Sequence, residues 1–191
     1  MKNKFSDPTT AFQQALKHVP EWALVQELIS RACSGKTYLV GGAVCRAIAH
    51  VWHNTPLPKH DWDVIAEKVN TTKAGAGWQL GVNKFGNPKL ARGKTEVDIM
   101  PLNNIRSILR RKLEPNIENY LSGTPVTVQA VAYDLQTKQI IGDIGINALR
   151  EGTVAVNNAE ELACEAERKK ITPDALLKKK AESMGFRAIE Q

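Results

Sequence analysis

Cysteine and long hydrophobic runs are both scarce in this chain. Its three cysteines, Cys33, Cys45 and Cys164, are odd in number and form no Cys-x-x-Cys pair. We therefore expect free thiols in a reducing compartment rather than a disulfide framework or a zinc site. No apolar run approaches the roughly 20 residues that a membrane helix needs, and no apolar stretch follows the N-terminal lysines as it would in a secretory signal. The sequence predicts a cytoplasmic protein without a membrane partner.

Acidic residues are outnumbered by basic ones, and aromatic residues make up only 6% of the chain. The 191 residues, 42% hydrophobic and 24% charged, suffice for one well-buried domain, or for one domain with a small appendage. The net charge of +6 favours an anionic partner, because Lys and Arg concentrate in the segments 106–112 and 168–180. The alternative is an ordinary basic surface that keeps the protein in solution.

The segment 37–67 contains the strongest functional pattern. A short apolar strand at 38–40 leads into Gly41 and Gly42, and a helix is predicted over 43–53. Bare backbone N–H groups at a glycine bend, together with a helix N-terminus, can bind a phosphate. This segment therefore predicts a nucleotide phosphate site.

Carboxylates on two predicted strands indicate a metal site beside those glycines. Asp61 and Asp63 share one face of a strand at 61–66, with Trp62 on the opposite face. Paired carboxylates repel each other unless a cation or a shared proton offsets the repulsion, and they suit Mg²⁺. Asp98 lies on a second strand at 95–100 and supplies the third acid of a two-metal site. An edge strand with a solvated acidic face is the alternative.

The rest of the chain is predicted to alternate between helices and strands. The predicted helices are two within 8–34, of which the second ends at Gly35, and then 103–113 with its arginines outward, 145–151, 159–170 and 174–184. The predicted strands are 80–84, followed by a turn at 86–88, a hairpin over 126–142, and 153–156.

These motifs, in this order, resemble the head domain of the poly(A) polymerase and CCA-adding tRNA nucleotidyltransferase group, within the DNA polymerase β-type superfamily. The resemblance covers about residues 37–157. Besides the double glycine and the Asp-x-Asp strand, it is carried by Phe85-Gly86-Asn87, Glu96-Val97-Asp98-Ile99, the segment 127–134 and the segment 141–149.

The resemblance implies an α+β fold, in which a mixed β-sheet is flanked by helices. The core would be a head-like domain at 37–157. Extra helices would lie at both ends, with 1–36 packing on the core and 158–191 forming a short neck-like segment. Asp61, Asp63 and Asp98 would be the catalytic residues and would bind two Mg²⁺ ions, or Mn²⁺ in their place.

The resemblance also implies a reaction. Gly41 and Gly42 would bind the triphosphate of an NTP, and we place Arg46 and Lys59 in the same nucleotide site. The NMP would pass to a hydroxyl of RNA such as tRNA, or of a protein or small molecule. A non-catalytic nucleotide- or nucleic-acid-binding module is the second interpretation, and a DNA-binding or toxin–antitoxin partner protein, suggested by charge alone, is the third.

Three departures separate this chain from the family pattern. The family helix begins Gly-Gly-x-Val-Arg-Asp, whereas here Cys45 precedes Arg46, which rotates the basic side chain by about 100°. The family's Arg-Arg-Asp aligns with 123–125, and its Glu-Asp-x-x-Arg has no counterpart within 172–186. The helical body and tail of the family are also missing, so a protein partner is a candidate source of those functions.

Overall fold

The computed structural model describes residues 5–57 and 61–190. Its α-helices are α1 (Pro8–Leu16), α2 (Glu21–Ala32), α3 (Gly42–His53), α4 (Arg106–Arg110), α5 (Ile117–Leu121), α6 (Asp143–Glu151), α7 (Ala159–Lys169) and α8 (Pro173–Glu182). Its strands are β1 (Cys33–Val40), β2 (Trp62–Val69), β3 (Gln79–Val82), β4 (Pro88–Arg92), β5 (Thr95–Pro101), β6 (Ala132–Asp134), β7 (Gln139–Ile141), β8 (Thr153–Val154) and β9 (Arg187–Ala188). Short 3₁₀ helices form η1 (Thr71–Lys73), η2 (Leu102–Asn104) and η3 (Thr127–Gln129).

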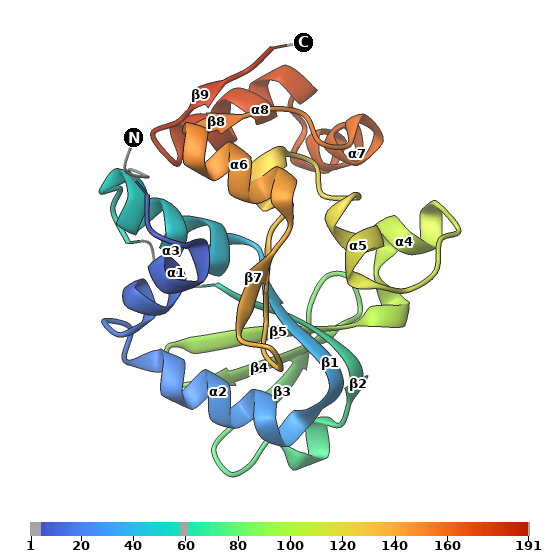
Figure 1. Ribbon diagram of the computed structural model, residues 1–191. Coiled ribbons are helices and arrows are strands. Elements are labelled where there is room, and N and C mark those ends of the chain that lie inside the picture. The colour runs from blue at the N-terminus through green and yellow to red at the C-terminus, as the bar shows by residue number, and fades with distance from the viewer. Residues whose placement is uncertain (1–4, 58–60, 191) are drawn as a thin grey trace.

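A seven-stranded mixed sheet forms the centre of the molecule (Figure 1). The strand order is β3-β4-β5-β2-β1-β6-β7, and β8 and β9 form a separate two-stranded sheet. Within the large sheet β2 and β5 run parallel, while the other neighbours are antiparallel. The predicted α+β class with a mixed sheet is therefore confirmed.

The two faces of the sheet bury different side chains. Leu39 and Val64 belong to a large core that also contains side chains of α1, α2 and α3. Their neighbours Val40 and Ile65 belong to a smaller cluster under α4 and α5. Alternate residues of a strand point to opposite faces, so the apolar run in β1 supplies both layers. Figure 1 shows α1 and α3 on one side of the sheet and α4 and α5 on the other.

The C-terminal helices pack on the same core rather than apart from it. Leu149 of α6, Leu162 of α7 and Leu176 of α8 are buried in the cluster that contains Leu39 of the sheet. Figure 1 places these three helices together above the sheet. The predicted boundaries at 36/37 and 157/158 remain predictions, but no gap in apolar packing marks the second one within the described residues.

Several elements differ from the prediction. The helix expected at 103–113 is shorter, because Lys112 adopts φ 53° after α4. The helix α5 was not predicted, and the Asn116 side chain caps it by accepting from the Asn119 N–H. Gly35 lies inside β1 instead of ending α2, at an irregularity in the pairing with β2 where φ is +72°. Residues 127–129 form η3 rather than a strand.

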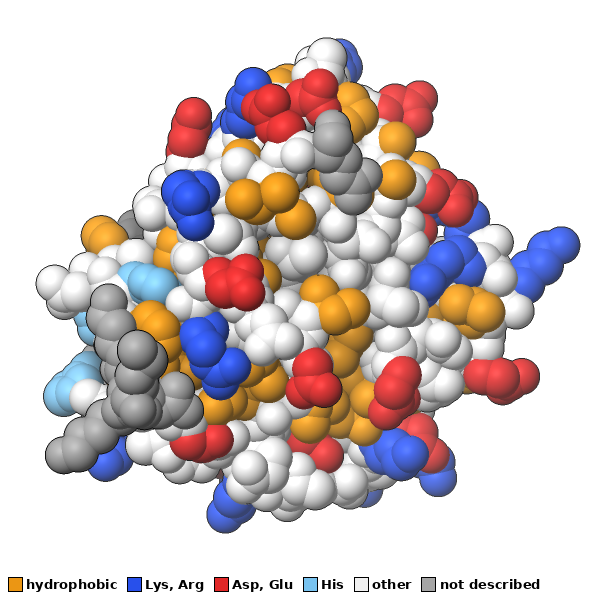
Figure 2. All heavy atoms as spheres, turned by 45° about the horizontal axis from the view of Figure 1, so that its top comes forward, with side chains coloured by type: hydrophobic (Ala, Val, Ile, Leu, Met, Phe, Trp, Pro, Cys, Tyr) orange, Lys and Arg blue, Asp and Glu red, His pale blue; other side chains and the backbone are white. Residues whose placement is uncertain are grey.

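Surface charge is mixed on the face of Figure 2, where acidic and basic side chains alternate. The excess of +6 is thus not gathered into one patch on this face. In the described part of the chain, no helix combines the length and the apolar character that crossing a membrane requires.

Candidate functional site

Asp63 and Asp98 lie side by side on the two parallel strands in the middle of the sheet. They are register partners between β2 and β5, and neighbouring strands are about 4.8 Å apart. Both side chains are half-buried. By strand alternation they share the face of Ile65, which packs under α4 and α5. The structure therefore brings together two of the three carboxylates predicted to form the site.

The burial of Trp62 fixes which face of the sheet each side chain of β2 occupies. This side chain is buried to 2% exposure and stacks on Trp22 of α2, with ring centroids 5.3 Å apart. Because Trp62 occupies the opposite face, Asp63 must point to the α4/α5 side. Asp61 precedes β2 and is exposed.

Electrostatic repulsion among the three acids is strongest at Asp63. Burial, together with the nearby charges of Asp98 and Asp61, raises the pKa of Asp63 to about 7. Residues 5–57 and 61–190 nevertheless contain no group of three or more His, Cys, Asp or Glu side chains placed to hold a metal ion. Asp63 and Asp98 thus form a pair, and Asp61 stands close enough to affect it without completing a three-ligand set.

The backbone bends sharply at Gly41, next to the Asp63 carboxylate. Its φ of +71° and ψ of −148° are accessible essentially to glycine alone. A Cβ at this position would lie 2.7 Å from Oδ2 of Asp63. At Gly42 an added Cβ would meet only the Arg46 side chain, at 3.9 Å. The α3 helix that follows has no side-chain cap among the described residues, so its N-terminus beside Asp63 is suited to an anion.

Arg46, predicted to bind nucleotide, forms hydrogen bonds with Ser183 in this structure. Its guanidinium donates to the backbone oxygen (3.3 Å) and to the hydroxyl (3.2 Å) of Ser183, at the end of α8. Gly42 and Arg46 line a cavity of about 260 Å³ together with Lys169, Lys179 and other residues of α7 and α8. Arg46 is thus at the edge of the predicted site, and Lys59 lies outside the described residues.

Lys180 in α8, which belongs to the basic segment 168–180, is a half-buried cation. Its ammonium lies 3.1 Å from the Glu165 carboxylate and donates to Gln129 at 3.1 Å. Burial lowers the pKa of Lys180, and Glu165 opposes this effect. Lys169 contacts the same carboxylate at 2.7 Å. These contacts fix α7 and α8 to each other and to η3.

Lys89 and Asn83 are functional candidates that sequence reasoning missed. Lys89 is the register partner of Asp98 across β4 and β5, and its ammonium contacts Glu96 at 2.6 Å. Asn83 donates to Oδ1 of Asp98 at 3.3 Å. Glu96 lies on the same face of β5 as Asp98 and forms an ion pair with Lys89. Prediction of β4 as a strand would have revealed Lys89, because alternation then places it opposite Asp98.

The turn between β3 and β4 is tied to this acidic site. The Asn83 side-chain oxygen accepts from the backbone N–H groups of Phe85 (2.9 Å) and Asn87 (3.1 Å). Asn104 in turn donates to the Asn87 side chain at 2.7 Å. The turn is therefore held between Asp98 on one side and η2 on the other.

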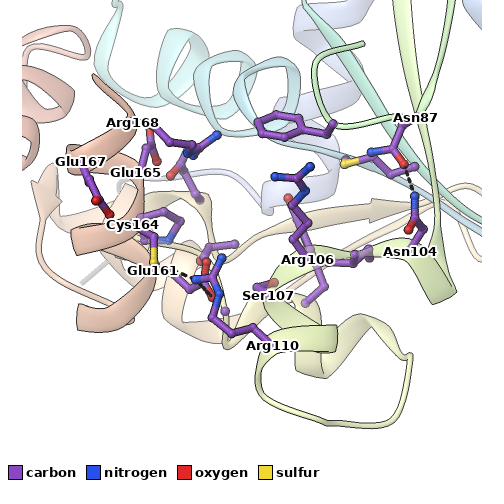
Figure 3. A pocket seen from close by; sticks show the side chains of 18 residues that line it. Asn87, Asn104, Arg106, Ser107, Arg110, Glu161, Cys164, Glu165, Glu167 and Arg168 are labelled. Atoms are coloured by element: carbon purple, nitrogen blue, oxygen red, sulfur yellow. Dashed lines mark hydrogen bonds and ion pairs between the residues drawn. The ribbon is translucent and has the colours of Figure 1, made fainter. Parts of the chain in front are cut away.

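A cavity of about 400 Å³ opens beside this turn (Figure 3). Side chains from the turn, η2, α4, α5 and α7 line it, and Figure 3 shows Asn87, Arg106 and Arg168 around it. It contains Tyr120 of α5, whose pKa is raised by burial and further by the Asp63 charge. The cavity thus adjoins the face of the sheet that carries the carboxylates.

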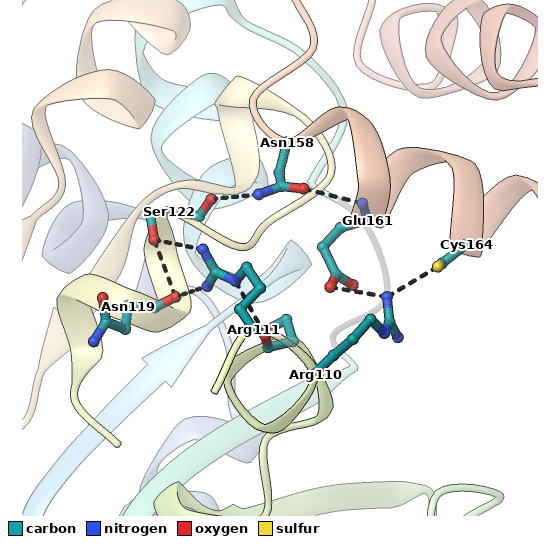
Figure 4. Close-up of polar contacts among 8 residues, drawn as sticks. Arg110, Arg111, Asn119, Ser122, Asn158, Glu161 and Cys164 are labelled. Atoms are coloured by element: carbon teal, nitrogen blue, oxygen red, sulfur yellow. Dashed lines mark hydrogen bonds and ion pairs between the residues drawn. The ribbon is translucent and has the colours of Figure 1, made fainter. Parts of the chain in front are cut away.

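Arg110 of α4 is exposed as predicted, whereas Arg111 directly after the helix is half-buried, and both contact other segments of the chain (Figure 4). Arg110 pairs with Glu161 at 2.9 Å and also contacts the Cys164 sulfur at 2.9 Å. Arg111 donates to the Ser122 hydroxyl at 3.0 Å and to backbone oxygens of α4 and α5. Arg110 thus links α4 to α7, and Arg111 links the end of α4 to the nearby α5.

Comparison with solved structures identifies the fold. A CCA-adding enzyme in complex with CTP superposes with a TM-score of 0.65 at 19% identity, over 100% of this chain and 44% of that one. The Thermotoga maritima CCA-adding enzyme with tRNA superposes with a TM-score of 0.61 at 18% identity, over 98% of this chain and 43% of that one. The fold is that of the CCA-adding enzymes. A tRNA nucleotidyltransferase with primer tRNA and an incoming ATP analogue gives 0.57 at 19%, over 81% and 44%.

The CCA-adding fold confirms the resemblance predicted from the ordered motifs. No family model matches the sequence, and no curated protein matches it either. The chain spans less than half the length of the CCA-adding structures it resembles. Identity below 20% supports the fold alone, so the activity of this chain has to be argued from its own residues.

Proposed function

We propose that this chain is a metal-dependent nucleotidyltransferase, which transfers an NMP from an NTP to a hydroxyl acceptor, with RNA such as tRNA as the leading candidate. The observation that carries the proposal is the pair Asp63 and Asp98 on adjacent parallel strands, next to the bend at Gly41. The neighbouring structures support the same chemistry, because they are described as bound to CTP, ATP or tRNA.

The donor chemistry of the site fits Mg²⁺. Asp63 and Asp98 are adjacent acids whose repulsion a divalent cation would offset. Mg²⁺ commonly takes only one or two carboxylates, with water and substrate phosphates as its other ligands. Asp61, Asp63 and Asp98 are the residues that would hold two such ions. Bound Mg²⁺ would supply charge neutralisation for the triphosphate and a lower pKa for the acceptor hydroxyl.

The chain's own residues would orient the two substrates. The N–H groups at Gly41 and Gly42 and the N-terminus of α3 would bind the triphosphate. The acceptor hydroxyl would approach from the Asp98 side, where Asn83 holds the carboxylate. Its oxygen would bond to the α-phosphorus, pyrophosphate would leave, and the hydroxyl proton would pass to water. Loss of Asp98 should therefore reduce turnover more than NTP binding.

A non-catalytic nucleotide-binding module is the second candidate. It is favoured by the absence of a three-acid group among the described residues and by the engagement of Arg46 with Ser183. Such a module would bind an NTP without transferring it.

Transfer of label from each α-labelled NTP to total RNA, in the presence of Mg²⁺, distinguishes the two candidates. We expect labelled RNA from the wild-type protein, and none from Asp61→Ala or Asp98→Ala. NTP binding without product, unaffected by metal, would support the non-catalytic module instead. Salt-sensitive binding to duplex DNA without any NTP dependence would contradict both.

A further inference from the structure

A second cavity, of about 320 Å³, lies at the end of β1 that is remote from the glycine bend. Lys36 and Tyr38 of β1, Glu67 of β2 and Glu118 of α5 line it, together with apolar side chains of η2 and α5. Its volume falls at the lower end of the range of small-molecule sites. None of the carboxylates or glycines of the proposed active site is among the described residues that line it. This cavity is therefore a separate place for a ligand.

Tyr38 brings a buried side chain with an unpartnered hydroxyl to this cavity. The residue is 5% exposed, and its hydroxyl forms no hydrogen bond with any other described residue. The oxygen is not sealed in the protein either, because it is not among the fully buried polar atoms that lack a partner. A phenol hydroxyl can both donate and accept. A ligand in the cavity would supply the missing partner.

Three carboxylates lie near this hydroxyl without a paired cation. Burial and the charges of Asp134, Glu118 and Glu67 all raise the pKa of Tyr38, so the hydroxyl stays protonated. In residues 5–57 and 61–190, none of the three acids forms an ion pair. Unpaired acids of one sign create a negative potential in the space between them. A positively charged ligand would be attracted to this space.

The Glu67 carboxylate is held in place by the backbone of β1. Its Oε2 accepts from the Lys36 N–H at 3.1 Å. A Cβ at Gly35 would lie 2.5 Å from the same oxygen, so a larger residue at this position would displace the carboxylate. Oε1 has no hydrogen-bond partner in the described part of the chain. Glu67 is thus oriented before any ligand binds, which lowers the entropic cost of binding.

Lys36 does not neutralise the acids. It lines the cavity, but it is exposed and joins none of the ion pairs among the described residues. Glu67 and Glu118 therefore outnumber it within the lining, even before Asp134 is counted. The remaining charge is negative.

We propose that this cavity binds a small organic cation with a primary ammonium group, which would donate to the Tyr38 hydroxyl and the Glu67 carboxylate. The apolar part of the cation would pack on Leu102 and Ile117, which line the cavity and are buried. This site is additional to the proposed nucleotidyl transfer and does not rest on it.

Titration of ¹⁵N-labelled protein with benzylamine, followed by backbone amide shifts at pH 7 in EDTA and without NTP, tests the site independently of catalysis. Benzyl alcohol and benzoate serve as neutral and anionic probes of similar size. We expect benzylamine to bind at least about fivefold more tightly than either of them, because a charge-assisted hydrogen bond is stronger than a neutral one. Equal binding of benzyl alcohol or benzoate would overturn the proposal.

Loss of the two lining carboxylates should weaken binding. The test variant carries Glu67→Gln with Glu118→Gln. The matched control carries Glu21→Gln with Glu160→Gln, which removes two exposed carboxylates outside the cavity. We expect benzylamine to bind the test variant at least about fivefold more weakly than the control. Equal affinity of the two variants would refute the site.

Lys36→Gln distinguishes a cation site from an anion site. It removes a like charge, so benzylamine should bind about two- to threefold more tightly than to wild type. Weaker binding of benzylamine to this variant would overturn the proposal.

Tyr38→Phe decides the role of the hydroxyl, even if the double variant fails to fold. It should weaken benzylamine binding by about threefold or more, while the thermal midpoint stays the same or rises because no hydrogen bond within the protein is lost. Unchanged binding, or a midpoint lowered by the loss of the hydroxyl, would contradict the proposal.

Discussion

Asp63 is the residue on which charge and burial conflict most strongly. It is half-buried, it lies beside Asp98, and its pKa is raised to about 7. Between its ordinary pKa of 3.8 and that value, the folded protein holds a proton that the unfolded chain has released. The contribution of Asp63 to stability is therefore most favourable at low pH, falls as pH rises through this window, and is constant above it.

Asp63→Asn should remove this pH dependence. We expect the stability of the variant relative to wild type to rise by about 2–4 kcal/mol between about pH 4 and pH 8, because the amide cannot ionise. Urea unfolding of both proteins at a series of pH values measures the difference. A difference that stays constant over this range would contradict the predicted environment of Asp63.

Gly41 is required for two separate reasons, and a control glycine separates them. Gly41→Ala should destabilise the protein by about 1–3 kcal/mol through its backbone conformation alone, and by more because its Cβ would meet Asp63 at 2.7 Å. Gly86 also has a positive φ, +82°, but a Cβ there would meet nothing within 4 Å. Denaturant unfolding should therefore show a larger loss for Gly41→Ala than for Gly86→Ala. Equal losses would show that the contact with Asp63 is unimportant.

At the scale of elements, the C-terminal helices are part of the main core. Leu176 of α8 is 1% exposed and packs in the cluster that includes the sheet. Leu176→Ala should cost about 2–5 kcal/mol and lower the midpoint of one cooperative transition. Leu80→Ala, at a position 59% exposed on β3, should change stability little. Tryptophan fluorescence and far-UV circular dichroism should report the same midpoint. Two separate transitions in the Leu176 variant would mean that the helices fold apart from the sheet.

The elements predicted best are those whose signals are local. The strand, glycine pair and helix of 37–53 follow from apolar periodicity and glycine placement, and β1 and α3 occupy that segment. The helices α7 and α8 begin at side-chain caps, Asn158 and Thr172; α7 lies within its predicted range, and α8 begins one residue before its own. The face shared by Asp63 and Asp98 follows from strand alternation once β2 and β5 are recognised.

The features missed depend on contacts that the sequence does not encode locally. The ion pair of Arg110 requires Glu161, which lies 51 residues away. The role of Lys89 depends on β4, and β4 was not predicted as a strand. The meeting of Arg106 and Arg168 at Phe85 depends on the packing of α7 against the turn. Two basic segments could be identified from composition, but their convergence could not.

At the scale of the whole molecule, a mixed sheet brings a glycine bend and carboxylates from two strands to one face. The chain as a whole superposes on a CCA-adding enzyme at 19% identity.

Anomalous diffraction from crystals grown with Mn²⁺ and a non-hydrolysable NTP analogue is the most direct test of the metal site. We predict an anomalous peak between the carboxylates of Asp63 and Asp98, with the triphosphate of the analogue at Gly41 and Gly42. Bound analogue at those glycines without any Mn²⁺ at the two carboxylates would contradict the assignment of this face as a metal-dependent active site.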